Sequence, residues 1–125
     1  MKILVTGGSR GIGKSIVTRF RRDGHIVFAP SRNELDLSKE IVLQDIQFDV
    51  VINNAGINPL KNIIDISDEE VMSVNYNAPL QIIQKCLPYM VKQRFGRIVN
   101  IGSIWINKAK KMRLGKPWRF RHRRC

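Results

Sequence analysis

Short apolar runs alternate with stretches of helical periodicity along most of this chain. The apolar runs are rich in β-branched residues, which is typical of strands buried on both faces of a sheet. These predicted strands span 2–6, 25–29, 49–53 and 97–103, with 34–37 as a candidate for a very short additional strand. Apolar residues at helical spacing predict helices over 12–20, 38–47 and 79–91.

The predicted helices carry start and stop signals. Gly24 suits the end of the first helix. Residues 67–70 (Ser-Asp-Glu-Glu) form a capping-box pattern, which predicts a helix that ends near Asn75. Pro79 fits the first turn of the following longer helix, whereas Pro88 lies inside it and is expected to kink or shorten it. Alternating strands and helices of this kind predict an α/β fold with an open parallel sheet covered by helices on both faces.

Charge divides the chain into two parts. The formal net charge is +12 over 125 residues, from 22 Lys and Arg against 10 Asp and Glu. Nine of the basic residues and none of the acidic ones lie in 108–125, which leaves 13 bases and 10 acids in 1–107. We therefore expect a folded domain over 1–107 and an unstructured basic tail over 108–125.

The remaining composition excludes several classes of protein. The two cysteines, Cys86 and Cys125, form no metal-binding spacing and no disulfide framework, so we expect a reduced cytoplasmic setting and no metal site. The apolar run at the N-terminus is too short for a signal peptide, and no stretch is long enough to span a membrane.

The glycine-rich segment Thr6–Gly13 follows the first predicted strand and opens the first helix. Glycines at this place let the backbone turn tightly and approach a pyrophosphate, and the helix N-terminus offers free N–H groups. The spacing of Gly7, Gly11 and Gly13 differs from the usual G-x-G-x-x-G pattern. A simple loop is the alternative, and the flanking strand and helix argue against it.

The pattern T-G-x-x-x-G-x-G resembles that of the short-chain dehydrogenase/reductase family, and three further motifs follow in the family's order. They are Asn53–Gly56 (NNAG), Asn75 within VNYNAP, and Ser103 at the end of GRIVNIGS. The resemblance implies a Rossmann-like, doubly wound sheet, here incomplete with about five strands. A missing helix before 35–37 is similar to nucleotide-sugar-modifying relatives, whereas NNAG is similar to the ordinary reductases.

The resemblance also implies roles for single residues. Asn75 would hold a water in the proton relay, and Ser103 would hydrogen-bond the substrate oxygen. The residues implied to bind the cofactor are Gly7, Ser9, Arg10, Gly11, Ile12 and Gly13 at the pyrophosphate and adenosine ribose, Asp36 and Leu37 at the adenine, and Asn53, Ala55 and Gly56 beneath the second ribose.

NADP(H) is favoured over NAD(H) on physical grounds. An acidic residue after the second strand would bind a ribose 2′-hydroxyl and repel a 2′-phosphate. This chain has Arg32 there, which with Arg10 favours the phosphate, although Glu34 nearby weakens the preference. The alternative is that both arginines are solvated surface charges.

One family motif is missing. The family's chemistry uses Tyr-x-x-x-Lys about a dozen residues after the serine, and the two tyrosines here, Tyr76 and Tyr89, are followed four residues later by Leu80 and Gln93. Our leading hypothesis is an interrupted reading frame in a reductase gene, with the tail translated out of frame. The rival is a genuine short product whose basic, aromatic tail contacts nucleic acid, which we disfavour against an inert tail.

Two functions remain open. The first is an NADP(H)-dependent oxidoreductase acting on a carbonyl or alcohol carbon, of which this chain is an impaired fragment. The second is a non-catalytic binding module that uses the remnant sheet and the basic tail to bind a partner protein or nucleic acid. In either case, apolar faces left uncovered by an incomplete sheet favour self-association.

Overall fold

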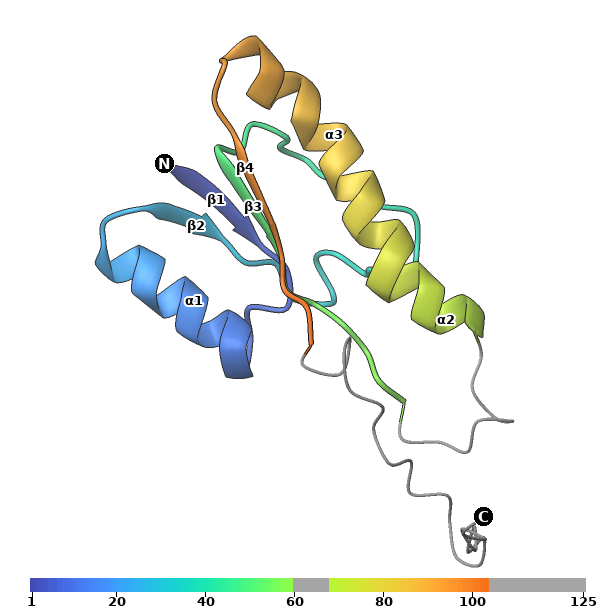
Figure 1. The fold of residues 1–125 in the computed structure, drawn as a ribbon. Coiled ribbons are helices and arrows are strands. Elements are labelled where there is room, and N and C mark those ends of the chain that lie inside the picture. The colour runs from blue at the N-terminus through green and yellow to red at the C-terminus, as the bar shows by residue number, and fades with distance from the viewer. Residues whose placement is uncertain (60–67, 104–125) are drawn as a thin grey trace, which may run out of the picture.

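The computed structural model describes residues 1–59 and 68–103. Helices connect β1 to β2 and β3 to β4, while β2 and β3 are joined by a segment without a helix. The sheet lies between α1 on one side and α2 with α3 on the other (Figure 1). In chain order the elements are β1 (Lys2–Val5), α1 (Gly11–Arg22), β2 (Ile26–Phe28), β3 (Val50–Asn53), α2 (Asp68–Met72), the π-helix η2 (Ser73–Asn77), α3 (Ala78–Lys92) and β4 (Arg97–Asn100).

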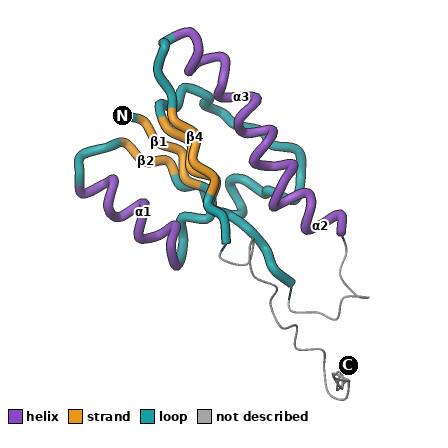
Figure 2. The backbone as a smooth tube through the Cα atoms, viewed as in Figure 1, coloured by secondary structure: helices purple, strands orange, loops and turns teal. Residues whose placement is uncertain are grey.

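The strands form one parallel sheet with the order β2-β1-β3-β4 (Figure 2). The chain first moves outward from β1 to β2 and then returns to the other side of β1 to add β3 and β4. The order therefore reverses between β1 and β3, and ligands of open α/β sheets bind beyond the carboxyl ends of the strands at such a switch point.

The two faces of the sheet bury separate apolar clusters, because successive side chains of a strand point to opposite faces. Ile3, Val5 and Ile52 pack with Val17 of α1. Leu4 lies on the other face, against α3. The remaining buried members of this second cluster are Leu35, Ile41, Phe48, Val51, Ala78, Ile82, Cys86 and Met90. Burial on both faces explains why β1 and β3 read as continuous apolar runs.

The predicted α/β architecture and most of its elements are confirmed. Helix α1 ends at Arg22, and the amide of Gly24 donates to Arg21 O at 3.1 Å, so the predicted stop is where the sequence places it. Asp68 begins α2, as the capping pattern indicates, while Ser67 lies outside the described residues. The boundary expected near residue 107 also falls outside them, so the division into domain and tail stays a prediction.

The segment 30–48 corrects two expectations. Residues 34–37 are not a strand and 38–47 are not a helix, so the described sheet has four strands. The reason is local: Asp36 Oδ1 accepts from the amide and hydroxyl of Ser38, and Asp45 Oδ1 accepts from the amide of Gln47. Such side-chain bonds compete with helical ones. The apolar residues are still buried, since Ile41 and Phe48 are 0% and 1% exposed.

The predicted break near Asn75 is also wrong, because α2, η2 and α3 follow one another without interruption. Asn75 instead lies in a π-helical turn, a feature that is frequent at functional sites. Pro88 does not shorten α3, which continues to Lys92. Its missing amide removes one helical bond, and the packing of α3 on the sheet compensates for the loss.

Other features of the described residues bear on the class of protein. None of their helices is long and apolar enough to cross a membrane, and they hold no group of three or more potential metal ligands. Cys86 is a free, buried cysteine, and burial raises the pKa of its thiol to about 11. A high pKa keeps the thiol protonated, which fits a residue of the core rather than a nucleophile.

Candidate functional site

A cavity of about 230 Å³ opens beyond the carboxyl ends of β1, β2 and β3. Thr6 and Gly7 follow β1, Pro30 and Ser31 follow β2, and Ala55 follows β3. The cavity therefore lies at the switch point of the sheet. Its other lining residues are Ser9, Arg10, Arg32, Leu35, Asp36, Leu37, Ser38, Gly56, Ile57, Glu70 and Val74.

The glycine-rich loop is packed too closely for side chains. A Cβ atom added to Gly13 would lie 2.2 Å from Gly7 O and 2.4 Å from Asn54 Nδ2. Both distances are far below van der Waals contact, and Gly7 O is a backbone atom that cannot move independently of the loop. Gly13 thus lets the first turn of α1 approach the loop after β1.

Hydrogen bonds from the loop after β3 hold the glycine-rich loop in place. Asn54 Nδ2 donates to Thr6 O and to Gly7 O, both at 3.0 Å. In return, the hydroxyl oxygen of Thr6, which is 3% exposed, accepts from the amides of Asn54 and Ala55 at 3.1 Å each. Because these bonds join two loops that are distant in sequence, this edge of the cavity is preorganised.

The N-terminus of α1 has no capping side chain. Arg10 occupies the N-cap position without a side-chain cap hydrogen bond, and the first turn contains no acidic residue. The first amides of a helix have no partner inside the helix, and they carry the positive end of its dipole. An uncapped helix N-terminus beside a glycine-rich loop can therefore receive a phosphate group.

The far end of the cavity is polar and charged. Arg32 Nε lies 3.9 Å from Asp36 Oδ1, and the arginine side chain is 79% exposed. Hydrogen bonds from the hydroxyl and amide of Ser38 lower the pKa of Asp36, with smaller contributions from Arg32 and Lys39. Asp36 is therefore a fixed anion beside Leu37 at this end of the cavity.

Glu34 also makes specific contacts at this end. Its Oε2 accepts from both the amide and the hydroxyl of Ser31, at 2.7 Å each. These two hydrogen bonds lower the pKa of the Glu34 carboxyl. Both hydrogen-bond donors of Ser31, which lines the cavity, are thus bonded to the Glu34 carboxylate.

A second cavity, of about 260 Å³, lies between the end of β3, η2 and the end of β4. Asn53 Nδ2 donates to Asn100 Oδ1 at 2.9 Å, while Asn53 Oδ1 is buried without a hydrogen-bond partner in the described part of the chain. Asn75 also lines it, together with Ala55, Tyr76, Pro79, Leu80, Ile83 and Ile101. Ala55 lines both cavities, so they adjoin at the loop after β3.

The side chain of Asn75 is used to hold this loop. Asn75 Oδ1 accepts from the amide of Ile57 at 2.8 Å, and its Nδ2 donates to Ile57 O at 2.9 Å. Both polar atoms of the Asn75 side-chain amide are therefore bonded to the backbone of Ile57. The water-holding role that the family resemblance implies for Asn75 stays a prediction.

The structure brings together most of the predicted cofactor residues but not all. Ile12 is 65% exposed on α1, and Gly11, Ile12 and Gly13 do not line the first cavity, while Asn53 lines the second. The predicted residues that do line the first cavity are Gly7, Ser9, Arg10, Arg32, Asp36, Leu37, Ala55 and Gly56. Ser103 is exposed, three residues beyond the end of β4, and lines neither cavity.

Several lining residues were missed from the sequence. Thr6 and Ile57 lie inside or next to recognised motifs, and their roles depend on contacts between the loops. Asn54 does not line the cavity, but its bonds to Thr6 and Gly7 were also missed. Ser31, Leu35 and Ser38 lie in the segment after β2, which contains no helix. The only sequence signal for their place at the cavity was the short spacing between the second predicted strand and residues 35–37. Glu70 and Val74 had no sequence signal, because α2 and η2 reach the cavity only through tertiary packing.

Comparison with protein families finds a match to the family model described as short chain dehydrogenase, over residues 36–113. A curated relative, the 3-oxoacyl-(acyl-carrier-protein) reductase FabG of Staphylococcus aureus, is 32% identical over 81% of this chain and 55% of its own length. The 3-ketodihydrosphingosine reductase of Bacteroides thetaiotaomicron is 32% identical over 82% of this chain and 46% of its own length. The chain thus spans about half the length of these relatives.

Solved structures give the same fold. A short-chain dehydrogenase from Sphingobium yanoikuyae in complex with NADPH superposes with a TM-score of 0.72, at 26% identity over 82% of this chain and 54% of that one. A 4-hydroxyisoleucine dehydrogenase complexed with NADH has a TM-score of 0.76 at 23% identity, covering 89% of this chain and 59% of that one. One neighbour holds NADPH and the other NADH, so both forms of the cofactor occur on this fold.

Proposed function

The chain belongs to the short-chain dehydrogenase family, and we propose that it forms the cofactor-binding half of an oxidoreductase that uses NADP(H) to reduce a carbonyl or oxidise an alcohol. The observation that supports this most directly is the cavity at the switch point. A preorganised glycine-rich loop and an uncapped helix N-terminus meet there, as a pyrophosphate requires. The proposed setting is the cytoplasm.

The arrangement of the residues around the first cavity is suited to a dinucleotide. Gly13 lets the first turn of α1 approach the loop after β1, the N-terminus of α1 has no side-chain cap, and the charged end of the cavity lies past β2. The pyrophosphate would lie at Ser9, Arg10 and the start of α1, and the adenine at Asp36 and Leu37. Bound there, the cofactor would supply or accept the hydride, while this chain would bind and orient it.

The preference for NADP(H) is part of the proposal. Arg10 and Arg32 both line the cavity, and two guanidinium groups can form charge-assisted hydrogen bonds with a 2′-phosphate. We expect Arg32→Ala to weaken NADPH binding about tenfold while changing NADH binding little. Lys92→Ala, which removes an exposed charge from the last turn of α3, is the matched control. Titrations of cofactor fluorescence would measure both affinities, and an equal loss for the two cofactors would overturn the preference.

Catalysis by this chain alone is proposed to be impaired. The sequence has no Tyr-x-x-x-Lys, so the group that would exchange the proton with the substrate is missing. Asn75 and Ser103 would be the two relay members that it retains. We expect the purified 125-residue chain to bind NADPH only weakly, and not to oxidise it measurably in the presence of a panel of carbonyl compounds. Robust NADPH-dependent reduction would overturn this part, and absence of cofactor binding would overturn the whole proposal.

The second candidate is a non-catalytic binding module, and the exposure of β4 favours it. Ile98 and Val99 of β4, and Ile101 just after it, are 38–41% exposed, which is high for apolar residues of a parallel sheet, even on an edge strand. The proposed partner is a second copy of this chain, and nucleic acid would bind only through 108–125. Light scattering would test self-association, and deletion of 108–125 would test nucleic-acid binding. A monomer that binds no nucleic acid would exclude this candidate.

A further inference from the structure

The amide and the hydroxyl of Ser31, two donors that could bind a 2′-phosphate, are bonded to the carboxylate of Glu34. Ser31 lines the cavity beside Arg32, and both its amide and its hydroxyl donate to Glu34 Oε2 at 2.7 Å. Amides, hydroxyls and guanidinium groups are the donors that typically bind phosphate, and Ser31 supplies the first two beside the guanidinium-bearing Arg32. In this structure, Glu34 Oε2 accepts from both donors of Ser31, as a phosphate oxygen could.

We infer that Glu34 is a specificity-determining residue, whose carboxylate competes with the 2′-phosphate of NADP(H) for the donors of Ser31. This inference rests on the proposed cofactor function and deepens it. A ribose that carries a 2′-hydroxyl brings no negative charge to Ser31, so NAD(H) binds with the Glu34 contacts intact. NADP(H) must displace the carboxylate or lie beside it, and either costs affinity.

The charges around Ser31 indicate that Glu34 weakens binding of the 2′-phosphate only moderately. Arg32 and Arg10 line the cavity and attract a phosphate, whereas Asp36 in the lining and Glu34, bonded to Ser31, repel it. Arg32 is partly engaged already, since its Nε lies 3.9 Å from Asp36 Oδ1. Removing one of the two acids shifts the balance toward the phosphate. Ser31 and Glu34 are both exposed, so solvent screens the effect.

The test compares NADPH and NADH affinities for the full chain and for Glu34→Gln. The glutamine keeps the size of the side chain and its acceptor oxygen but removes the charge. We expect the ratio of NADPH to NADH affinity to rise about three- to fivefold, the effect of a single exposed charge. Glu40→Gln, an exposed position six residues further on, removes the same charge and should leave the ratio unchanged.

A second measurement follows Ser31 itself. In ¹⁵N–¹H spectra, adenosine 2′-monophosphate should shift the Ser31 amide more than adenosine 5′-monophosphate does, and more strongly in Glu34→Gln than in the unchanged chain. If both cofactors bind and their ratio stays the same in Glu34→Gln, the inference is wrong while the proposed function stands. If neither the cofactors nor the monophosphates perturb the residues of the cavity, the proposed function fails and the inference fails with it.

Discussion

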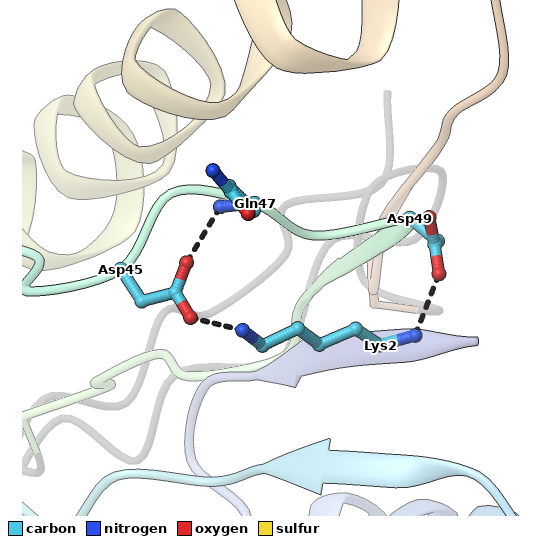
Figure 3. A network of polar contacts seen from close by, with 4 residues as sticks. All are labelled: Lys2, Asp45, Gln47 and Asp49. Atoms are coloured by element: carbon cyan, nitrogen blue, oxygen red, sulfur yellow. Dashed lines mark hydrogen bonds and ion pairs between the residues drawn. The ribbon is translucent and has the colours of Figure 1, made fainter. Parts of the chain in front are cut away.

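At the amino ends of β1 and β3, charged groups are joined to one another, whereas at the carboxyl ends neutral hydrogen bonds join the two loops that border the first cavity. Figure 3 shows the amino end: the Lys2 amide donates to Asp49 Oδ2 at 2.7 Å, and the Lys2 ammonium pairs with Asp45. Asp49 Oδ1 also accepts from Gln93 Nε2 at 3.1 Å. This end therefore ties β1, the segment before β3 and the end of α3 together.

The carboxyl end uses a different set of groups. Thr6 and Asn54 join the two loops through neutral hydrogen bonds, and the first turn of α1 keeps its amides uncapped. The comparison teaches that one sheet can separate two tasks. Bonds to charged groups stabilise the amino end, and at the other end α1 keeps an N-terminus without a side-chain cap that can receive a ligand.

The largest expected effect is at the carboxyl end. Gly13→Ala would place a Cβ 2.2 Å from a backbone oxygen, so we expect it to lower the free energy of unfolding by about 3 kcal/mol. Gly11→Ala is the matched control: φ there is +54° but nothing lies within 4 Å, so we expect a loss of about 1 kcal/mol. Urea unfolding followed by circular dichroism would measure both. Equal losses would show that the close approach of the two loops does not matter.

A smaller effect is expected at the amino end. Asp49→Ala removes acceptors from Lys2 and Gln93, and hydrogen bonds to a charged group lead us to expect a loss of about 2 kcal/mol in unfolding free energy. Asp45→Ala breaks a pair whose side chains are 36% and 43% exposed, so its loss should stay below about 1 kcal/mol. Neither variant should change NADPH affinity. A change in affinity would contradict the separation of the two ends.

The next-largest effect is expected at the loop after β3, which lies between the two cavities. Asn75→Ala removes both bonds to the backbone of Ile57, and we expect a loss of about 1 kcal/mol together with weaker NADPH binding. Amide hydrogen exchange at Ile57 should become faster. Asn77→Ala, at the end of the same π-helical turn, is the control and should leave exchange at Ile57 unchanged. Unchanged exchange in Asn75→Ala would mean that the amide does not hold the loop.

The smallest effect concerns pH. Hydrogen bonds from Ser31 lower the pKa of Glu34, so the folded state binds its proton less readily than the unfolded state does. The stability that this carboxylate contributes is therefore present above its ordinary pKa, near 4.3, and is lost as the pH falls through the lower folded value. Thermal melts between pH 6 and 3 should show a slightly steeper loss for the unchanged chain than for Glu34→Gln. Parallel curves would show that the Ser31 contacts contribute nothing to stability.

Much of the fold was readable from the sequence because its signals are local. The runs at 2–6 and 49–53 identify strands buried on both faces, and Gly24 marks the end of α1. The predictions that were wrong also have physical explanations. Side-chain bonds at Asp36 and Asp45 replaced the predicted helix, and continuous packing on the sheet carried the second helical region through Asn75 and past Pro88.

The sequence by itself determined the class of fold, the order of its main elements, the family and the edge of the sheet where a cofactor would bind. Periodicity, glycine spacing and short motifs encode these properties within a few neighbouring residues. Tertiary structure alone decided that Asn54 holds the glycine-rich loop, that Asn75 holds Ile57, and that α2 and η2 bring residues to the cavity. These contacts join segments distant in the chain, and only the packing of the sheet and its helices brings such segments within hydrogen-bonding distance.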